Sequence, residues 1–267
     1  MTNKIYFKNI LKVMIWPIIF LIGQFVIQYV FVSYFNYSNY NDLTNNELLE
    51  IIKTKDYQIK LESFIDSKTL LIALIGFVIF FPIFYKLFKK HKNKNKFNIK
   101  NIYEPILLGV SISLIYNITL FNLDNVIDKY ELITISSLPL IVQVITSGIL
   151  GPILEELLFR GYIYNKLKEF NPTMKSIILT CLIFALFHFN FIDSIYAFGV
   201  SFMFIYLYEK YKTLKAPIIM HQCLNITVIL LANIICKNNI IINYSLILCS
   251  IVILIIMNKR IIKNFTK

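Results

Sequence analysis

Two adjacent carboxylates, two histidines and an asparagine lie in the second half of the sequence, among long runs of apolar residues. They form three short patterns: Glu155-Glu156-x-x-x-Arg160, Phe184-x-x-x-His188 and His221-x-x-x-Asn225. A carboxylate can take a proton from water, and imidazole and amide groups can stabilise an oxyanion. Brought together from successive segments, these residues are sufficient to activate a water molecule and to hold a tetrahedral intermediate.

The two carboxylates have different neighbours along a helix. Glu156 and Arg160 are four residues apart, so they share one helix face and can form an ion pair. Glu155 points about 100° away from Glu156 and reaches that partner less easily. We therefore assign a structural and electrostatic role to the Glu156–Arg160 pair and the reactive role to Glu155, which apolar surroundings would suit to accept a proton from water.

A turn between the first two patterns predicts how they meet. Asn171-Pro172 is a strong turn signal within a charged stretch. Glu155 lies 16 residues before Asn171, and His188 lies 16 residues after Pro172. An antiparallel helical hairpin would therefore bring carboxylate and imidazole to one depth, roughly 24 Å from the turn at ~1.5 Å per residue.

The composition shows what kind of elements must position these side chains. The 267 residues are 57% hydrophobic and 16% charged, and their mean hydropathy is +0.66, which is typical of membrane proteins rather than soluble ones. Only helices are expected to cross the bilayer here, because no barrel-like alternation is present. The sequence predicts an all-α, polytopic protein with about eight transmembrane helices. The uncharged runs are Val13–Phe35, Thr69–Tyr85, Pro105–Leu123, Leu132–Leu154, Ser176–Ile192, Ser194–Tyr208, Ala216–Cys236 and Ile240–Met257.

The net charge of +12 comes from lysine clusters between these runs. Residues 86–104 carry seven lysines and one acid, whereas residues 36–68 carry six acids and four lysines. Basic and non-basic loops alternate along the chain, which predicts both termini in the cytoplasm. The charge is therefore explained by membrane topology, and we expect no nucleic-acid partner.

The chain divides into two parts by the character of its residues. Residues 1–131 hold the first three runs and have no chemical motif, so we expect a scaffold there. Residues 132–267 hold all three patterns and form the predicted catalytic core. The four cysteines lie in or beside apolar runs without paired spacing, which favours a packing role.

The ordered patterns resemble the CPBP family, which comprises the CAAX-prenyl protease and bacteriocin-processing intramembrane proteases, also called the Abi domain. The resemblance covers Leu138–Leu254 and includes the Phe159-Arg160-Gly161 extension of the first pattern. It implies an eight-helix intramembrane endopeptidase with a cytosol-facing cavity.

The resemblance also implies roles for the residues. Glu155 would activate the water with help from His188, and His221 and Asn225 would hold the oxyanion. Glu156 and Arg160 complete the first pattern. Glu155, His188 and His221 could also bind Zn²⁺ with a water in the fourth position. There is no His-Glu-x-x-His spacing, so glutamate-dependent and metal-dependent chemistry both stay open.

The expected setting is a bacterial cell membrane, since the Ile-, Asn- and Lys-rich composition is typical of a low-GC bacterium. The partners would be membrane lipid and a membrane-associated peptide or protein substrate. Bacteriocin immunity, peptide maturation and surface-protein display are the implied roles. The alternative is a non-proteolytic membrane partner that confers immunity or regulates a sensor. A transporter is disfavoured, because no paired Gly/Pro-interrupted segments indicate an inverted repeat.

Overall fold

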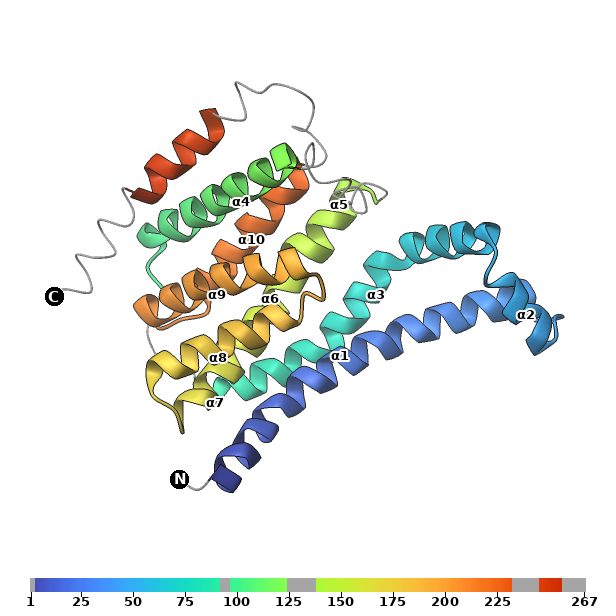
Figure 1. The fold of residues 1–267 in the computed structure, drawn as a ribbon, viewed down its shortest axis with the longest axis horizontal. Helices are drawn as coiled ribbons and strands as arrows, with labels where there is room; N and C mark the ends of the chain where they lie inside the picture. Colours follow the sequence, from blue (N-terminus) through green and yellow to red (C-terminus); the bar gives the residue numbers. More distant parts are fainter. Residues whose placement is uncertain (1–2, 92–96, 124–137, 232–244, 256–267) are drawn as a thin grey trace.

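The computed structural model describes residues 3–91, 97–123, 138–231 and 245–255, in which every regular element is helical. The helices form an elongated bundle from which one hairpin projects (Figure 1). The elements are α1 (Asn3–Tyr40), α2 (Asn45–Ile51), α3 (Lys55–Lys89), the 3₁₀ turn η1 (Ile99–Asn101), α4 (Tyr103–Leu123), α5 (Leu140–Gln143), the π-helix η2 (Val144–Leu150), α6 (Gly151–Glu156), the π-helix η3 (Leu157–Tyr164), α7 (Asn165–Lys168), α8 (Thr173–Leu186), α9 (Phe191–Tyr211), α10 (Lys215–Leu230) and a last helix, Ser245–Ile255. The prediction of an all-α protein is confirmed.

The chain is a membrane protein. Four described helices are long and apolar enough to cross a bilayer: Lys4–Tyr40, Lys55–Lys89, Leu140–Lys168 and Phe191–Tyr211. All eight predicted runs overlap a helix of the described residues. The number of crossings and the cytoplasmic termini stay predictions, because the acidic loop 124–131 and the basic C-terminal cluster lie outside the described residues.

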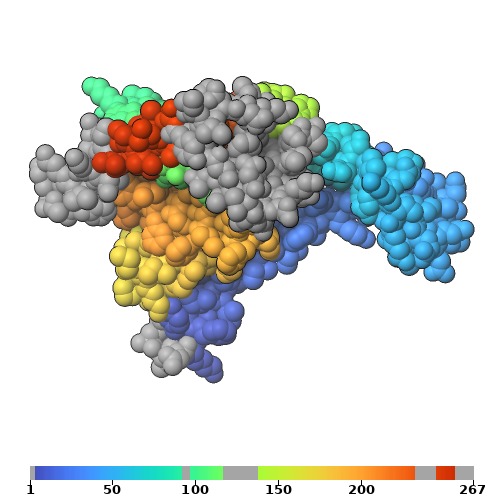
Figure 2. Space-filling model, turned by 45° about the horizontal axis from the view of Figure 1, so that its top comes forward, coloured from blue at the N-terminus to red at the C-terminus, as the bar shows by residue number. Residues whose placement is uncertain are grey.

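The helices α1 and α3 form the projecting hairpin, which Figure 2 shows reaching away from the body. Phe20 of α1 packs edge-on against Phe80 and Phe84 of α3, with ring centroids 5.0 and 5.4 Å apart. Gly23 lets the two helices approach closely, since a Cβ there would lie 2.3 Å from the Phe80 ring. At ~1.5 Å per residue both helices exceed the ~30 Å hydrocarbon core, so the hairpin tip extends beyond it.

Local hydrogen bonds fix the hairpin tip. Thr44 and Glu47 form a capping box at the start of α2, and the hydrogen bond from the Thr44 hydroxyl lowers the pKa of Glu47. The Tyr57 hydroxyl of α3 donates to the Asn36 side chain of α1 at 2.7 Å. The tip is therefore held by polar contacts, whereas the rest of the hairpin is held by aromatic packing.

The segments from α5 to α7 follow one another without a break, as one irregular helix over residues 140–168. In η2 the Gly151 N–H donates to the Thr146 carbonyl, five residues back, as a π-helix requires. The predicted uncharged run ends at Leu154, but the helix continues for 14 residues beyond it. Glu155 and Glu156 therefore lie within the helix, between its two π segments.

The predicted turn at Asn171-Pro172 is confirmed, with Pro172 preceding the first residue of α8. The expectation of a helix that carries His188 is wrong, because α8 ends at Leu186. His188 lies in the turn before α9, where Phe189 has a positive φ of 54° and the Asn190 side chain accepts from the Ile192 N–H at 2.9 Å. A left-handed residue followed by an N-cap ends one helix and starts the next.

The helix α4, which the sequence places with the N-terminal helices, packs along α10. A Cβ on Gly109 would lie 2.4 Å from the Met220 carbonyl oxygen, so only glycine permits this close approach. The start of α4 is tied to the end of α9 by Glu104, which is buried and receives both an ion pair from Lys210 at 2.6 Å and a hydrogen bond from Tyr206 at 3.2 Å. The helix α4 thus contacts both α10, at Gly109, and the end of α9, at Glu104.

Candidate active site

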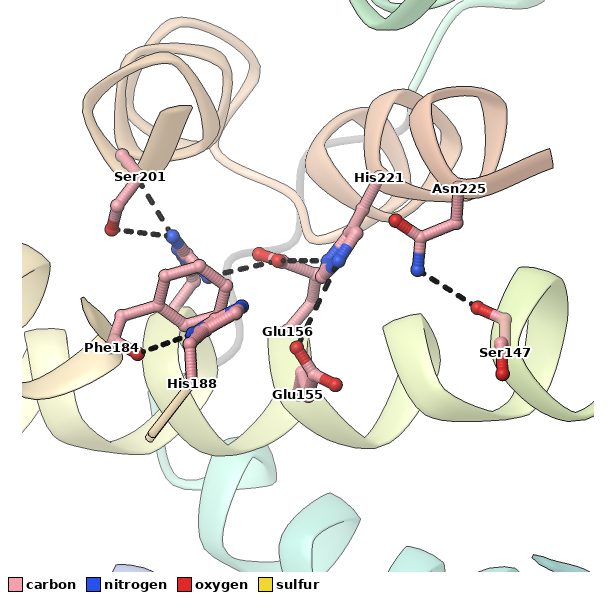
Figure 3. A network of polar contacts seen from close by, with 9 residues as sticks. Ser147, Glu155, Glu156, Phe184, His188, Ser201, His221 and Asn225 are labelled. Carbon is pink, nitrogen blue, oxygen red and sulfur yellow. Dashed lines mark hydrogen bonds and ion pairs between the residues drawn. The ribbon is translucent and has the colours of Figure 1, made fainter. Parts of the chain in front are cut away.

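A buried carboxylate lies at the centre of the site. The Glu156 side chain is 0% exposed, and its Oε1 accepts hydrogen bonds from Arg160 Nη1 and from His221 Nδ1, each at 2.9 Å (Figure 3). The ion pair expected from the spacing of Glu156 and Arg160 is present. Breaking such a buried pair leaves an uncompensated charge, so the two residues depend on each other.

The guanidinium of Arg160 is fully enclosed. It lies between two aromatic rings, 4.4 Å from the centroid of Phe184 and 4.7 Å from that of Phe204. Its Nη2 donates to the Ser201 hydroxyl at 2.6 Å. Cation–π contacts and a charge-assisted hydrogen bond thus fix the plane and direction of this cation.

His221 is oriented by the same network. Its ring stacks on Phe204 with centroids 4.6 Å apart and planes 25° apart. Because a carboxylate only accepts, the 2.9 Å contact to Glu156 assigns the proton to Nδ1 of His221. The Nε2 atom is then directed at Glu155, whose Oε2 lies 3.8 Å away. The two adjacent glutamates therefore face different nitrogens of one imidazole, Glu156 facing Nδ1 and Glu155 facing Nε2.

Glu155 is the accessible member of the pair. Its side chain is 32% exposed, against 0% for Glu156. The 3.8 Å contact to His221 is longer than a hydrogen bond, and the described residues provide no direct donor to the Glu155 carboxylate. This carboxylate can therefore accept a proton from a water or substrate group, while that of Glu156 is occupied.

His188 approaches the site from the turn after α8 and is an exposed residue. Its Nδ1 lies 3.0 Å from the Phe184 carbonyl oxygen, which assigns the proton to Nδ1 and leaves Nε2 as an acceptor. Phe184 contacts both imidazoles, with centroids 4.9 Å from His188 and 6.1 Å from His221. The two rings thus lie around one phenyl group, although no direct contact joins His188 to Glu155 in the described structure.

Asn225 contacts the backbone of η2. Its Nδ2 donates to the Ser147 carbonyl at 2.8 Å. In a π register that carbonyl would pair with the N–H five residues on, and residue 152 is a proline without one. The Asn225 amide supplies the missing donor, and Figure 3 shows its nitrogen turned toward Ser147. The predicted oxyanion role of Asn225 requires its second N–H or a rotated amide, and stays a prediction.

The predicted zinc ligands do not converge as a set. Among the described residues no group of three His, Cys, Asp or Glu side chains is placed to share a metal ion. Glu155 and His221 form a pair, and His188 does not complete it. The residues as placed do not fit a zinc site, so the mechanism below contains no step through a metal.

The part of the chain that contains these site residues is similar to known proteins. Residues 137–227 match the family model described as type II CAAX prenyl endopeptidase Rce1-like. Over 97 residues the chain is 31% identical to the "Putative membrane peptidase YdiL" of Bacillus subtilis (strain 168). The resemblance to the CPBP family is confirmed.

The extent of the CPBP match is limited. The aligned stretch covers 36% of this chain and 39% of the Bacillus protein, and no solved structure matches the chain. The family-matched segment nevertheless contains all six predicted site residues: Glu155, Glu156, Arg160, His188, His221 and Asn225. The hairpin of α1 and α3 lies outside it.

Sequence reasoning missed three contributors to the CPBP-like site. Ser201 and Phe204 hold Arg160 and His221, and the Ser147 carbonyl holds Asn225. Ser201 gave a weak signal, as a hydroxyl within an apolar segment. Phe204 and Ser147 gave none, because an aromatic residue in a membrane helix and a backbone carbonyl are both ordinary features.

Proposed function

We propose that this chain is an intramembrane endopeptidase that cleaves a membrane-associated peptide or protein in a bacterial cell membrane. The observation that carries the proposal is the division between the adjacent carboxylates. Glu156 is buried and committed to Arg160 and His221, while Glu155 is accessible and faces the Nε2 side of His221. This is the arrangement of a general base beside an oriented imidazole. The Rce1-like match supports a peptide bond as the target.

The mechanism follows from the accessible groups. Glu155 takes a proton from water, and the resulting hydroxide adds to the scissile carbonyl carbon. His188 Nε2, unprotonated in the described arrangement, can accept a hydrogen bond from the same water. The protonated Glu155 then gives its proton to the amide nitrogen as the C–N bond breaks, leaving a free amine and a carboxylic acid.

The negative oxygen of the intermediate needs hydrogen-bond donors. The second N–H of Asn225 can supply one, and His221 can supply another as an imidazolium that has taken a proton from solvent at Nε2; both lie on one face of α10. Both side chains are tied to residues 140–168, His221 through Glu156 and Asn225 through Ser147. The helix that carries the base and the helix that carries the oxyanion donors are thus linked at two points.

The test compares the membrane proteomes of a deletion strain and a strain that carries Glu155→Gln. The same uncleaved precursor should accumulate in both strains, because the variant keeps the fold and loses the base. The substrate found in this way would distinguish bacteriocin immunity, peptide maturation and surface-protein display. Full complementation of the deletion by a Glu155→Gln/His188→Ala double variant would contradict proteolysis and support the non-proteolytic partner.

Metal dependence is tested separately. We expect cleavage by the purified protein to continue in the presence of a strong chelator, since the described residues do not converge as a zinc site. The control is a known zinc protease in the same detergent, which the chelator must inhibit. Loss of cleavage with chelator and recovery with added Zn²⁺ would contradict the water-and-carboxylate mechanism.

A further inference from the structure

Ser201 lies three contacts away from His221 and outside the three sequence patterns. Its side chain is fully buried on α9, and its Oγ accepts from Arg160 Nη2 at 2.6 Å. Arg160 Nη2 also donates to the Ser201 backbone carbonyl, at 3.5 Å. A guanidinium only donates, so the hydroxyl oxygen is the acceptor in this contact. Ser201 is therefore a fixed acceptor at the end of a buried chain.

This series of side-chain contacts leads from Ser201 through Arg160 and Glu156 to His221. Nη1 of Arg160 donates to Glu156, whereas Nη2 donates to Ser201. The Oε1 atom of Glu156 accepts hydrogen bonds from both Arg160 and His221. The Oε2 atom has no hydrogen-bond partner in the described structure. Arginine otherwise prefers to hold a carboxylate with two parallel hydrogen bonds. Here Nη2 is instead directed at Ser201, with the hydroxyl at 2.6 Å as its shorter contact and the backbone carbonyl at 3.5 Å.

We propose that Ser201 is a positioning residue: by holding Nη2 of Arg160 away from Glu156, it keeps the Glu156 Oε1 atom directed at His221 Nδ1. Without the hydroxyl, Nη2 turns to the free Oε2, and the carboxylate rotates into a two-point pair with Arg160. His221 then loses its fixed proton acceptor, and the Nδ1–H tautomer that directs Nε2 toward Glu155 is no longer enforced. The inference rests on the proposed function only for its consequence on catalysis.

The direct test is the tautomer of His221, read by ¹⁵N NMR of the detergent-solubilised protein labelled at histidine. The sequence has three histidines, so single His91→Gln and His188→Gln variants assign the spectrum. At about pH 8 the wild type should show His221 protonated at Nδ1 alone. Ser201→Ala should show a mixture of the two tautomers. An unchanged Nδ1–H signal in Ser201→Ala would overturn the proposal, whatever the outcome for proteolysis.

Two controls separate this role from general packing. Ser176→Ala removes another fully buried hydroxyl, which bonds to the Pro172 carbonyl at 3.2 Å, and should leave the His221 signal unchanged. If Ser201→Ala does not fold, Ser201→Thr and Ser201→Val form a pair of equal shape that differs in the hydroxyl. The threonine variant should keep the wild-type tautomer and the valine variant should lose it. Equal spectra for the two would overturn the proposal.

The kinetic readout follows from the same geometry. Removing a group that orients the ligands of a metal site typically costs about 10–100-fold in activity, and we expect a similar loss here. We expect Ser201→Ala to lower kcat by about tenfold or more with little change in KM, because Ser201 is fully buried. A change confined to KM would contradict a positioning role.

Discussion

The hairpin of α1 and α3 and the helices from residue 140 to residue 230 use apolar residues for different purposes. In the most apolar stretches of α1 and of α3, 17% of the residues are buried inside the molecule. The share is 33% in the most apolar stretch of the helix Leu140–Lys168 and 39% in that of α9. The hairpin therefore directs most of its apolar side chains outward, where a membrane protein meets lipid. The second region encloses a full ion pair, Glu156–Arg160, with both side chains 0% exposed.

The difference shows where the free energy of folding depends on individual side chains. Many interchangeable contacts hold the hairpin, such as the Phe20, Phe80 and Phe84 rings, whereas the site depends on polar groups that each have few alternatives. A buried charge that loses its partner costs several kcal/mol, but an exposed pair contributes little. Substitution of a charged side chain should therefore lower the stability of the site region much more than that of the hairpin.

The largest expected effect comes from comparing two glutamates in ion pairs. Glu156→Gln leaves Arg160 buried without a counter-charge and should destabilise the protein by about 3–5 kcal/mol. Glu50→Gln in α2 breaks a pair with Lys53 whose side chains are 77% and 68% exposed, and should leave the melting temperature unchanged. Thermal unfolding in one detergent measures both variants. Equal shifts for the two would remove the distinction between the regions.

Two glycines sharpen the comparison through backbone packing. Gly109→Ala would place a Cβ 2.4 Å from the Met220 carbonyl and displace α10, so we expect a loss of about 1–3 kcal/mol together with activity. Gly23→Ala meets the end of the Phe80 ring, a side chain in the hairpin, and should lower stability without changing the site. Melting temperature and cleavage rate, measured on the same preparations, separate the two outcomes.

A control for these variants is Gly199→Ala, because nothing lies within 4 Å of the added Cβ. Alanine is favoured over glycine within a helix by about 1 kcal/mol, so this variant should be neutral or slightly stabilised. Retained cleavage by Gly109→Ala at the wild-type rate would show that the approach of α4 does not position α10.

The smallest expected effect lies where the hairpin joins the rest of the molecule. His91 follows α3 and is 18% exposed, with Nε2 3.9 Å from Glu169. Burial lowers the pKa of His91, although Glu169 opposes the shift. The unfolded chain therefore binds a proton more readily, and stability should fall as the pH drops below the ordinary value of 6.5. His91→Gln should reduce that fall between pH 7 and pH 5, and an identical pH dependence of melting would contradict it.

Sequence reasoning predicted the features that hydrophobicity and helical spacing decide. The apolar runs located the helices, the turn at Asn171-Pro172 was confirmed, and the four-residue spacing of Glu156 and Arg160 predicted their ion pair. Each of these depends on local properties of the chain, so no knowledge of tertiary packing was needed.

The features that the sequence did not predict depend on tertiary context. The apolar run Ser176–Ile192 has no Gly or Pro that would end α8 before His188, although Asn190 is a good N-cap residue for α9. The contact of Asn225 with the Ser147 carbonyl requires α10 to pack against residues 140–168. Ser201 gained its place in the same way, by the packing of α9 beside Arg160.

The central claim is that Glu155 is the base and that its neighbour is structural. The most direct measurement is the cleavage of a pool of membrane-spanning peptides by purified protein in liposomes, wild type against Glu155→Gln. The account predicts a rate about 10²–10⁴-fold lower for the variant at an unchanged melting temperature, because Glu155 is accessible and lacks a direct hydrogen-bond donor among the described residues. Cleavage at the wild-type rate by Glu155→Gln would contradict it.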